Sequence, residues 1–181
     1  MRIAEFDDHR RILFLRDPLR RLVGFYWSWV VSNTSDWCYV GGRGEFPLKG
    51  ATFRELVEAI QRARELGIEL QHHLLSQIHD LPVLRADDHI ALIERLDEEL
   101  YDLDRQYGIT VFRPRTHSHP VDEQQTTPAM DRRPEWFTRK GFPRAECFFD
   151  AALATLARRC YAEDAALHAS MVGARPLVFH A

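Results

Sequence analysis

The stretch from Leu22 to Val31, Leu-Val-Gly-Phe-Tyr-Trp-Ser-Trp-Val-Val, decides the fold that we expect for this chain. Its side chains fit a period of two, which is typical of a strand that lies on a hydrophobic core. One face of such a strand would carry Val23, Phe25, Trp27, Trp29 and Val31. The opposite face would carry Gly24, Tyr26, Ser28 and Val30.

A helix is the competing interpretation of the same stretch. Asp17 could cap a helix whose first residue is Pro18, and apolar residues then recur with helical spacing. That stripe would be formed by Leu19, Leu22, Val23, Tyr26, Trp29 and Val30. We favour the strand, because β-branched and aromatic residues dominate the stretch and Gly24 lies inside it.

Neighbouring segments complete a small sheet in this prediction. Arg11–Leu15 and Trp37–Val40 have the apolar content of short strands, and Ser32–Asp36 between the last two strands supplies turn residues. Gly41–Gly44 would end the last strand. It could bind phosphate, but no P-loop or dinucleotide pattern surrounds it, so a plain turn is favoured. The sequence therefore predicts that residues 1–50 are mainly an antiparallel β meander.

Helix signals dominate residues 51–108. Thr52 and Glu55 form a capping box before an apolar helical stripe, and Gly67 is placed to end that helix in the left-handed conformation. A second helix is expected to end at Gly108. Its cap would be Asp87 or Asp88, while residues 68–80 fit a strand and a helix equally well.

The final third of the chain is less regular. Residues 114–142 form a long Pro-rich loop without periodicity, and such connections are usually functional or disordered. Residues 143–172 are expected to be helical, and Leu177–Phe179 fits a final strand. The prediction is an α+β fold in which the small N-terminal antiparallel meander packs on a mainly helical remainder, all within a single domain of residues 1–181.

Composition is that of an ordinary globular protein, with 45% apolar residues, 28% charged residues and a formal net charge of −3. The small net charge gives no global argument for nucleic-acid or membrane binding. Three cysteines without a CxxC pair indicate a reducing, cytoplasmic environment. The charged start of the chain lacks the apolar region of a signal peptide. The longest apolar run, Leu22–Val31, has about half the length that spans a bilayer.

Nine histidines suggest a candidate metal site. If residues 68–80 are helical, Glu69 and His72 lie at i and i+3, a spacing found in carboxylate-bridged metal sites. The candidate ligands of iron or zinc are Glu69, His72, His79, His117 and His119. The second Glu-x-x-His copy of a di-metal site is absent from the sequence. Polar surface is therefore the favoured interpretation, and no cofactor is expected in the isolated chain.

An exposed edge of the predicted meander could accept an added strand from a peptide. The candidate peptide-binding residues on the meander are Tyr26, Ser28, Trp37 and Tyr39. The edge could instead be covered by the chain's own strand around Val111 or Val178.

The segment Arg132–Phe142 mixes guanidinium groups with aromatic rings, and it has three interpretations. Its rings could pin the segment to its own core, anchor a protein partner or stack on bases. Core pinning is favoured, and nucleic acid is the least favoured. The candidate partner-binding residues are Arg132, Arg133, Trp136 and Phe137.

Three function classes follow: a non-catalytic accessory subunit that docks a peptide or partner enzyme, a small metal-dependent enzyme, and a nucleic-acid-binding or regulatory protein. The first needs no missing residues and is favoured. An amino-terminal meander, a helical remainder and this length resemble the accessory subunit of methanobactin-biosynthesis complexes. The resemblance covers layout only, and no site residue is carried over from it. It implies a heterodimer with an iron-dependent barrel enzyme and a precursor peptide whose leader pairs with an edge near Leu22–Val40.

Overall fold

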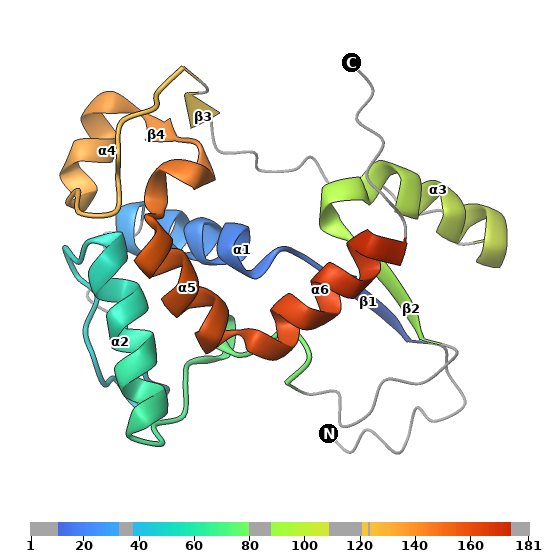
Figure 1. The fold of residues 1–181 in the computed structure, drawn as a ribbon, viewed down its shortest axis with the longest axis horizontal. Helices are drawn as coiled ribbons and strands as arrows, with labels where there is room; N and C mark the ends of the chain where they lie inside the picture. Colours follow the sequence, from blue (N-terminus) through green and yellow to red (C-terminus); the bar gives the residue numbers. More distant parts are fainter. Residues whose placement is uncertain (1–10, 33–37, 80–87, 109–120, 123, 175–181) are drawn as a thin grey trace. The chain divides into compact units, whose positions relative to one another are not determined.

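The computed structural model describes residues 11–32, 38–79, 88–108, 121–122 and 124–174, and within them it mixes helices with short strands (Figure 1). The helices are α1 (Pro18–Phe25), α2 (Phe53–Glu65), α3 (Leu96–Tyr107), α4 (Pro134–Lys140), α5 (Ala151–Cys160) and α6 (Ala162–Ala174). The strands are β1 (Ile12–Leu15), β2 (His89–Leu92), β3 (Val121–Asp122) and β4 (Phe142–Pro143). Short 3-10 turns cover His72–Leu74, Ile93–Arg95 and Ala145–Phe148, and a π-helix covers Tyr26–Val31.

Contacts divide the chain into two compact units. Unit 1 comprises Met1–Asp17, Gln77–Thr116 and Glu163–Ala181, and it contains β1, β2, α3 and most of α6. Unit 2 comprises Pro18–Ser76 and His117–Ala162, and it contains the remaining elements. The single domain of residues 1–181 stays a prediction.

Leu22–Val31 is helical, so the strand prediction is wrong. The α-helix α1 begins at Pro18, directly after Asp17, and continues into the π-helix, which ends with an i→i+5 bond from the Ser32 N–H to the Trp27 carbonyl oxygen (2.8 Å). The buried residues of the stretch are Leu22, Val23, Phe25, Tyr26, Val30 and Val31, and their spacing is helical. The stretch is apolar on nearly every side, so burial of a helix satisfies it as well as burial of a strand would.

The antiparallel meander is therefore absent from the described part of residues 1–50. The predicted strand at Arg11–Leu15 exists as β1, but β1 pairs in parallel with β2, in a register that joins Ile12 to His89 and Leu15 to Leu92. Tyr39 makes only an isolated antiparallel bridge to Pro47. Trp37 lies outside the described residues.

The predicted helix ends are confirmed where local capping chemistry specifies them. Thr52 and Glu55 form the capping box of α2, and Gly67 follows that helix with a left-handed φ of +65°. Gly108 ends α3 in the same conformation, with a φ of +64°. The predicted start of that helix is wrong, because His89–Leu92 is strand β2 and α3 begins at Leu96.

The later segments combine confirmed and wrong predictions. The helical prediction for residues 143–172 is confirmed over α5 and α6, but its start is wrong, because Phe142–Pro143 is strand β4 and α5 begins at Ala151. The Pro-rich loop prediction is wrong over α4, which Pro134 begins at the first helical position. Leu177–Phe179 lies outside the described residues. None of the helices that the structure describes combines the length and apolar character needed to cross a membrane.

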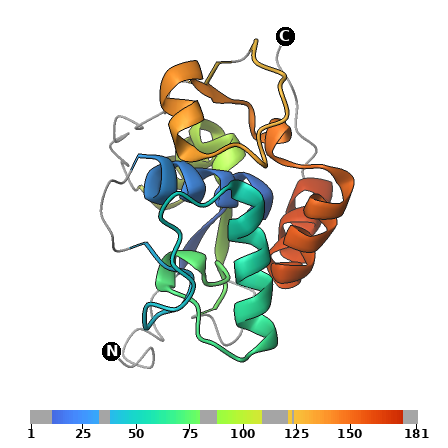
Figure 2. The same ribbon diagram turned by 90° about the vertical axis from the view of Figure 1, so that its left-hand side faces the viewer.

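Unit 2 has an aromatic core. The ring of Tyr26 meets those of Phe53, Phe137 and Phe148 at centroid distances of 5.5, 5.8 and 6.0 Å, all near edge-to-face. All four side chains are 0–1% exposed. The helices α2 and α5 contact each other along this unit (Figure 2).

Candidate docking edge

The outer edge of β1 is the candidate functional site of unit 1. The His89 N–H donates to the Arg11 carbonyl oxygen (2.9 Å), which sets the alternation of the parallel ladder. In this register the amides of Leu13 and Leu15 point towards β2, and those of Ile12 and Phe14 point away from it. Within the described residues β1 has no strand on that outer side.

An amide group already pairs with this outer edge at its end. The Arg16 N–H donates to Gln77 Oε1 (2.9 Å), and Gln77 Nε2 donates to the Arg16 carbonyl oxygen (2.8 Å). The side-chain amide of Gln77 thus makes the same two hydrogen bonds to Arg16 that the backbone of a neighbouring strand residue would make. The outer edge is therefore oriented to accept peptide groups.

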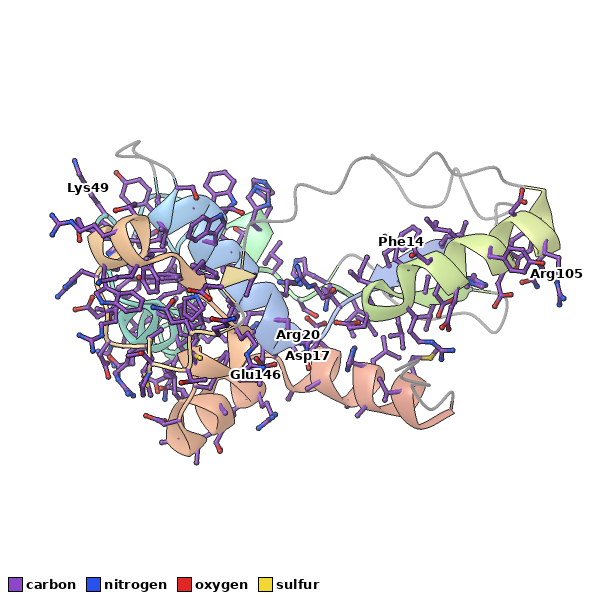
Figure 3. The ribbon with its side chains drawn as sticks, turned by 90° about the horizontal axis from the view of Figure 1, so that it is seen from above. Phe14, Asp17, Arg20, Lys49, Arg105 and Glu146 are labelled. Atoms are coloured by element: carbon purple, nitrogen blue, oxygen red, sulfur yellow. The ribbon has the colours of Figure 1, made fainter. Side chains whose placement is uncertain are left out.

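The side chains at this edge are apolar and exposed. Ile12 is 36% exposed and Phe14 is 40% exposed, and their spacing of two places them on the same face of β1. Leu15, on the opposite face, is fully buried. Figure 3 labels Phe14 on β1. We define the docking edge as the outward amides and side chains of Ile12 and Phe14.

Ion pairs hold the sheet in place. Arg11 donates from Nε and Nη2 to the two carboxylate oxygens of Asp88 (2.7 and 2.6 Å), which ties the start of β1 to the residue before β2. On β2, His89 Nε2 lies 3.6 Å from Glu99 Oε2 of α3 in a largely buried pair. His89 lies opposite Ile12 in the register, so the two side chains are on the same face of the sheet. The helix α3 therefore packs on this face at β2, while Ile12 and Phe14 on the same face of β1 are exposed.

The far end of β1 is anchored by carboxylates. The Gln77 N–H donates to both oxygens of Asp164 (3.0 Å each), whose residue is fully buried on α6. Glu94 accepts from the Asp17 N–H (2.9 Å) and lies 3.4 Å from His168 Nε2. These contacts tie Asp17, which follows β1, to Glu94, and Gln77 to α6.

The peptide-binding residues predicted on the meander do not gather at an edge. Tyr26 is fully buried in the core of unit 2, where its hydroxyl donates to the Ala51 carbonyl oxygen (2.9 Å). Ser28 is exposed on the π-helix, and Tyr39 is partly buried. Since Leu22–Val31 is helical, it offers no strand edge to a peptide.

The aromatic segment on α4 packs mainly on its own core. Phe137 is 1% exposed, and Trp136 is partly buried against the same cluster. The Arg132 guanidinium lies over the Trp136 ring (5.5 Å to the centroid). Arg133 donates to the Glu55 carboxylate (2.7 and 3.0 Å). Their role in partner binding stays a prediction.

The candidate metal ligands are not brought together in the part of the chain that the structure describes, where no group of three or more His, Cys, Asp or Glu side chains could hold a metal ion. Glu69 and His79 are exposed. His72 lies in a 3-10 turn, where its ring centroid is 3.8 Å from that of His73 and the two rings are tilted by 43°. His117 and His119 lie outside the described residues.

Two other features have structural explanations. Burial raises the pKa of the Cys38 thiol to about 11 and also raises the pKa values of Cys147 and Cys160, so these thiols stay protonated at neutral pH.

In the glycine-rich turn, the Arg43 N–H donates to Glu45 Oε2 (3.0 Å), and a Cβ at Gly41 would lie 2.3 Å from that oxygen. The Glu45 carboxylate therefore occupies the space inside this turn, where a phosphate would otherwise bind.

Ile12, Phe14 and Gln77 were not among the site residues that the sequence predicted. The apolar run at Arg11–Leu15 indicated a strand, but no periodicity within it distinguishes the exposed face. Comparisons with family models, curated proteins and solved structures found no match for this chain.

Proposed function

We propose that this protein is a docking subunit that accepts an extended segment of a partner polypeptide as an added strand on the docking edge. The observation that supports the proposal most directly is the pairing of Gln77 with Arg16, in which an amide already occupies one strand position at this edge. In strand addition, backbone hydrogen bonds supply affinity and alternate side chains supply specificity.

The small size of the sheet supports the same proposal. Parallel strands are normally covered on both faces, and sheets of two strands are marginally stable by themselves. Within the described residues, β1 and β2 form a two-stranded parallel sheet with exposed apolar side chains. An added strand would extend the ladder and cover Ile12 and Phe14.

The expected contribution of Phe14 can be estimated. A Phe side chain presents about 150–250 Å², so the 40% that is exposed here corresponds to about 60–100 Å². At about 25 cal/mol per Å², covering this area contributes about 1.5–2.5 kcal/mol, or roughly a 10- to 60-fold change in affinity.

A random peptide library provides the test. Twelve-residue peptides displayed on phage are selected against the intact chain, and the selected peptides are titrated against Ile12→Thr and Phe14→Thr, both of which place a β-branched residue of high strand propensity in β1. Affinity should fall by roughly tenfold or more for Phe14→Thr. The control is Leu66→Thr, which removes an apolar side chain that is 52% exposed in unit 2. Equal losses in all three variants, or none in the β1 variants, would contradict the proposal.

The finer assignments stay predictions. The docked segment would be the leader of a ribosomally made precursor peptide if the resemblance to methanobactin accessory subunits holds, and the partner would then be an iron-dependent enzyme. The docking edge itself does not depend on that resemblance, which rested on the meander.

A further inference from the structure

We propose that the side chain of Gln77 ends the docked strand, so that the docking edge accepts a short segment that leaves the sheet before it reaches Arg16. The inference rests on the proposed docking function. It assigns a specificity-determining residue to the edge and names the kind of segment that fits there.

The outward row of backbone groups on β1 continues to Arg16. The outward groups within β1 belong to Ile12 and Phe14, and the alternation of the ladder makes Arg16 the next residue in that row. The Arg16 N–H and carbonyl oxygen are both bonded to the Gln77 side-chain amide, at 2.9 and 2.8 Å. An added strand that extends past Phe14 would therefore find both backbone groups of Arg16 already paired.

The Gln77 amide fills one complete pairing position. In an antiparallel ladder, a hydrogen-bonded residue exchanges both of its bonds with the single residue opposite it. Gln77 does the same with Arg16 alone. The nearest outward position beside it is Phe14, roughly 7 Å back along the strand. The last backbone pair of a docked strand would therefore form with Phe14.

The backbone of Gln77 is anchored behind its side chain. The Gln77 N–H donates to both carboxylate oxygens of Asp164 (3.0 Å each), and Asp164 is fully buried. Hydrogen bonds to an ionised group are the stronger class, and taking a donor away from a buried charge is costly. An incoming strand would thus have to oppose these bonds, as well as the pair with Arg16, to displace Gln77.

These contacts define the segment that fits. Its two paired residues lie opposite Ile12 and Phe14, whose exposed side chains favour apolar neighbours on the same face. Two residues beyond the partner of Phe14, the segment meets Gln77 and has no backbone group of β1 to bind. Pro lacks an N–H and ends strands, so the edge accepts Pro at that position. The partner is therefore an extended segment with two apolar residues one residue apart, ended on the Arg16 side by Pro or another strand-ending residue.

Amide exchange in the full chain, measured by NMR, tests where the docked strand ends. The Arg16 amide should be protected both in the free chain and with a library-selected peptide bound, and the Gln77 side-chain NH2 signals should stay in place. Exchange at Ile12 and Phe14 should slow by about tenfold or more on binding. Movement of the Gln77 NH2 signals to those of a solvent-exposed amide would show that the peptide displaces Gln77, which overturns the inference while strand docking stands.

A second measurement tests the role of the Gln77 side chain. The selected peptide is lengthened by Thr-Val-Thr at each end, and each residue in turn is replaced by its N-methyl form, which lacks an N–H as Pro does. Against Gln77→Ala, the series should show one more sensitive alternate position than against the wild type, at one end of the pattern. Methylation there should weaken binding to the variant by about three- to tenfold, and to the wild type by less than about twofold.

Gln71→Ala is the matched control. Gln71 Nε2 also donates to a backbone carbonyl oxygen, that of Tyr39 (3.2 Å), but it lies in unit 2, and its loss should leave the pattern unchanged. The same pattern for the wild type and Gln77→Ala, or an equal extension in the control, would overturn this inference while strand docking stands. A pattern without alternation, or a library that yields no binding peptide, would overturn both proposals.

Discussion

The hydroxyl of Tyr26 joins two distant parts of unit 2. It donates to the carbonyl oxygens of Ala51 (2.9 Å) and Arg132 (3.3 Å). Burial raises the pKa of Tyr26, so the hydroxyl remains protonated and keeps its proton for these bonds. The residue that the strand interpretation placed on a binding face is a core residue with a structural role.

Tyr26→Phe should lower the free energy of unfolding by about 1–3 kcal/mol, because it leaves the buried Ala51 carbonyl without this donor. Urea unfolding measures the change. Tyr101→Phe removes the hydroxyl of a ring that is 67% exposed, and it should change stability by less than about 0.5 kcal/mol. Equal effects of the two variants would contradict the assigned role.

Glu55 gives a pH-dependent prediction. The backbone N–H of Thr52 donates to its carboxylate (2.7 Å), and this bond, with Arg133 nearby, lowers its pKa. A lowered pKa in the folded state stabilises the fold above the unfolded value of about 4.3, and this stabilisation is lost as the pH falls through the lower folded value.

The stability difference between the wild type and Glu55→Gln should therefore be largest at neutral pH and shrink below about pH 4. Because the Glu55 side chain is 46% exposed, solvent screening keeps the difference under about 1 kcal/mol. Chemical unfolding at a series of pH values measures it. A difference that does not change with pH would show that the charge of Glu55 does not contribute.

At the scale of elements, β1 has two rows of backbone groups with different partners. The groups of Leu13 and Leu15 bond to β2, while those of Ile12 and Phe14 face outwards. In the proposed complex, the outward row would pair only with alternate residues of an added strand.

N-methylation of a selected peptide tests this alternation. Methylation removes one N–H at a time without changing the side chain. Affinity should fall at alternate positions of the peptide and remain within about twofold at the positions between them, since only alternate N–H groups face β1. Isothermal titration of a complete methylation series measures the pattern. Losses without alternation would indicate that the peptide does not bind as a strand.

The success of sequence prediction also differs between elements. Both ends of α2 and the C-terminal end of α3 could be predicted, because capping needs only a few neighbouring residues, such as Thr52 with Glu55, or Gly108. Leu22–Val31 was mispredicted because an apolar segment of this length fits the period of a strand and of a helix. The pairing of β1 with β2 joins residues far apart in the sequence, and no local pattern specifies it.

At the scale of the whole chain, the two units use charge differently. Unit 2 pairs many of its charges internally; Arg54, for example, binds Asp131 and Asp150 (2.7 and 2.8 Å). Unit 1 contains more acidic than basic residues, and its strand β1 carries two exposed apolar side chains. The class of function expected from the sequence, peptide docking, is retained as a proposal, but its location moves from Leu22–Val40 to β1. That location follows from tertiary pairing and could not be predicted from composition or periodicity.

Amide hydrogen exchange at β1, resolved by NMR in the intact chain, tests the central claim most directly. In the isolated protein the amides of Leu13 and Leu15 should be protected, and those of Ile12 and Phe14 should exchange rapidly. A peptide selected from the library should slow exchange at Ile12 and Phe14 specifically. If these two amides are already as protected as Leu13 and Leu15, or if the bound peptide leaves them unchanged, β1 is not the docking edge.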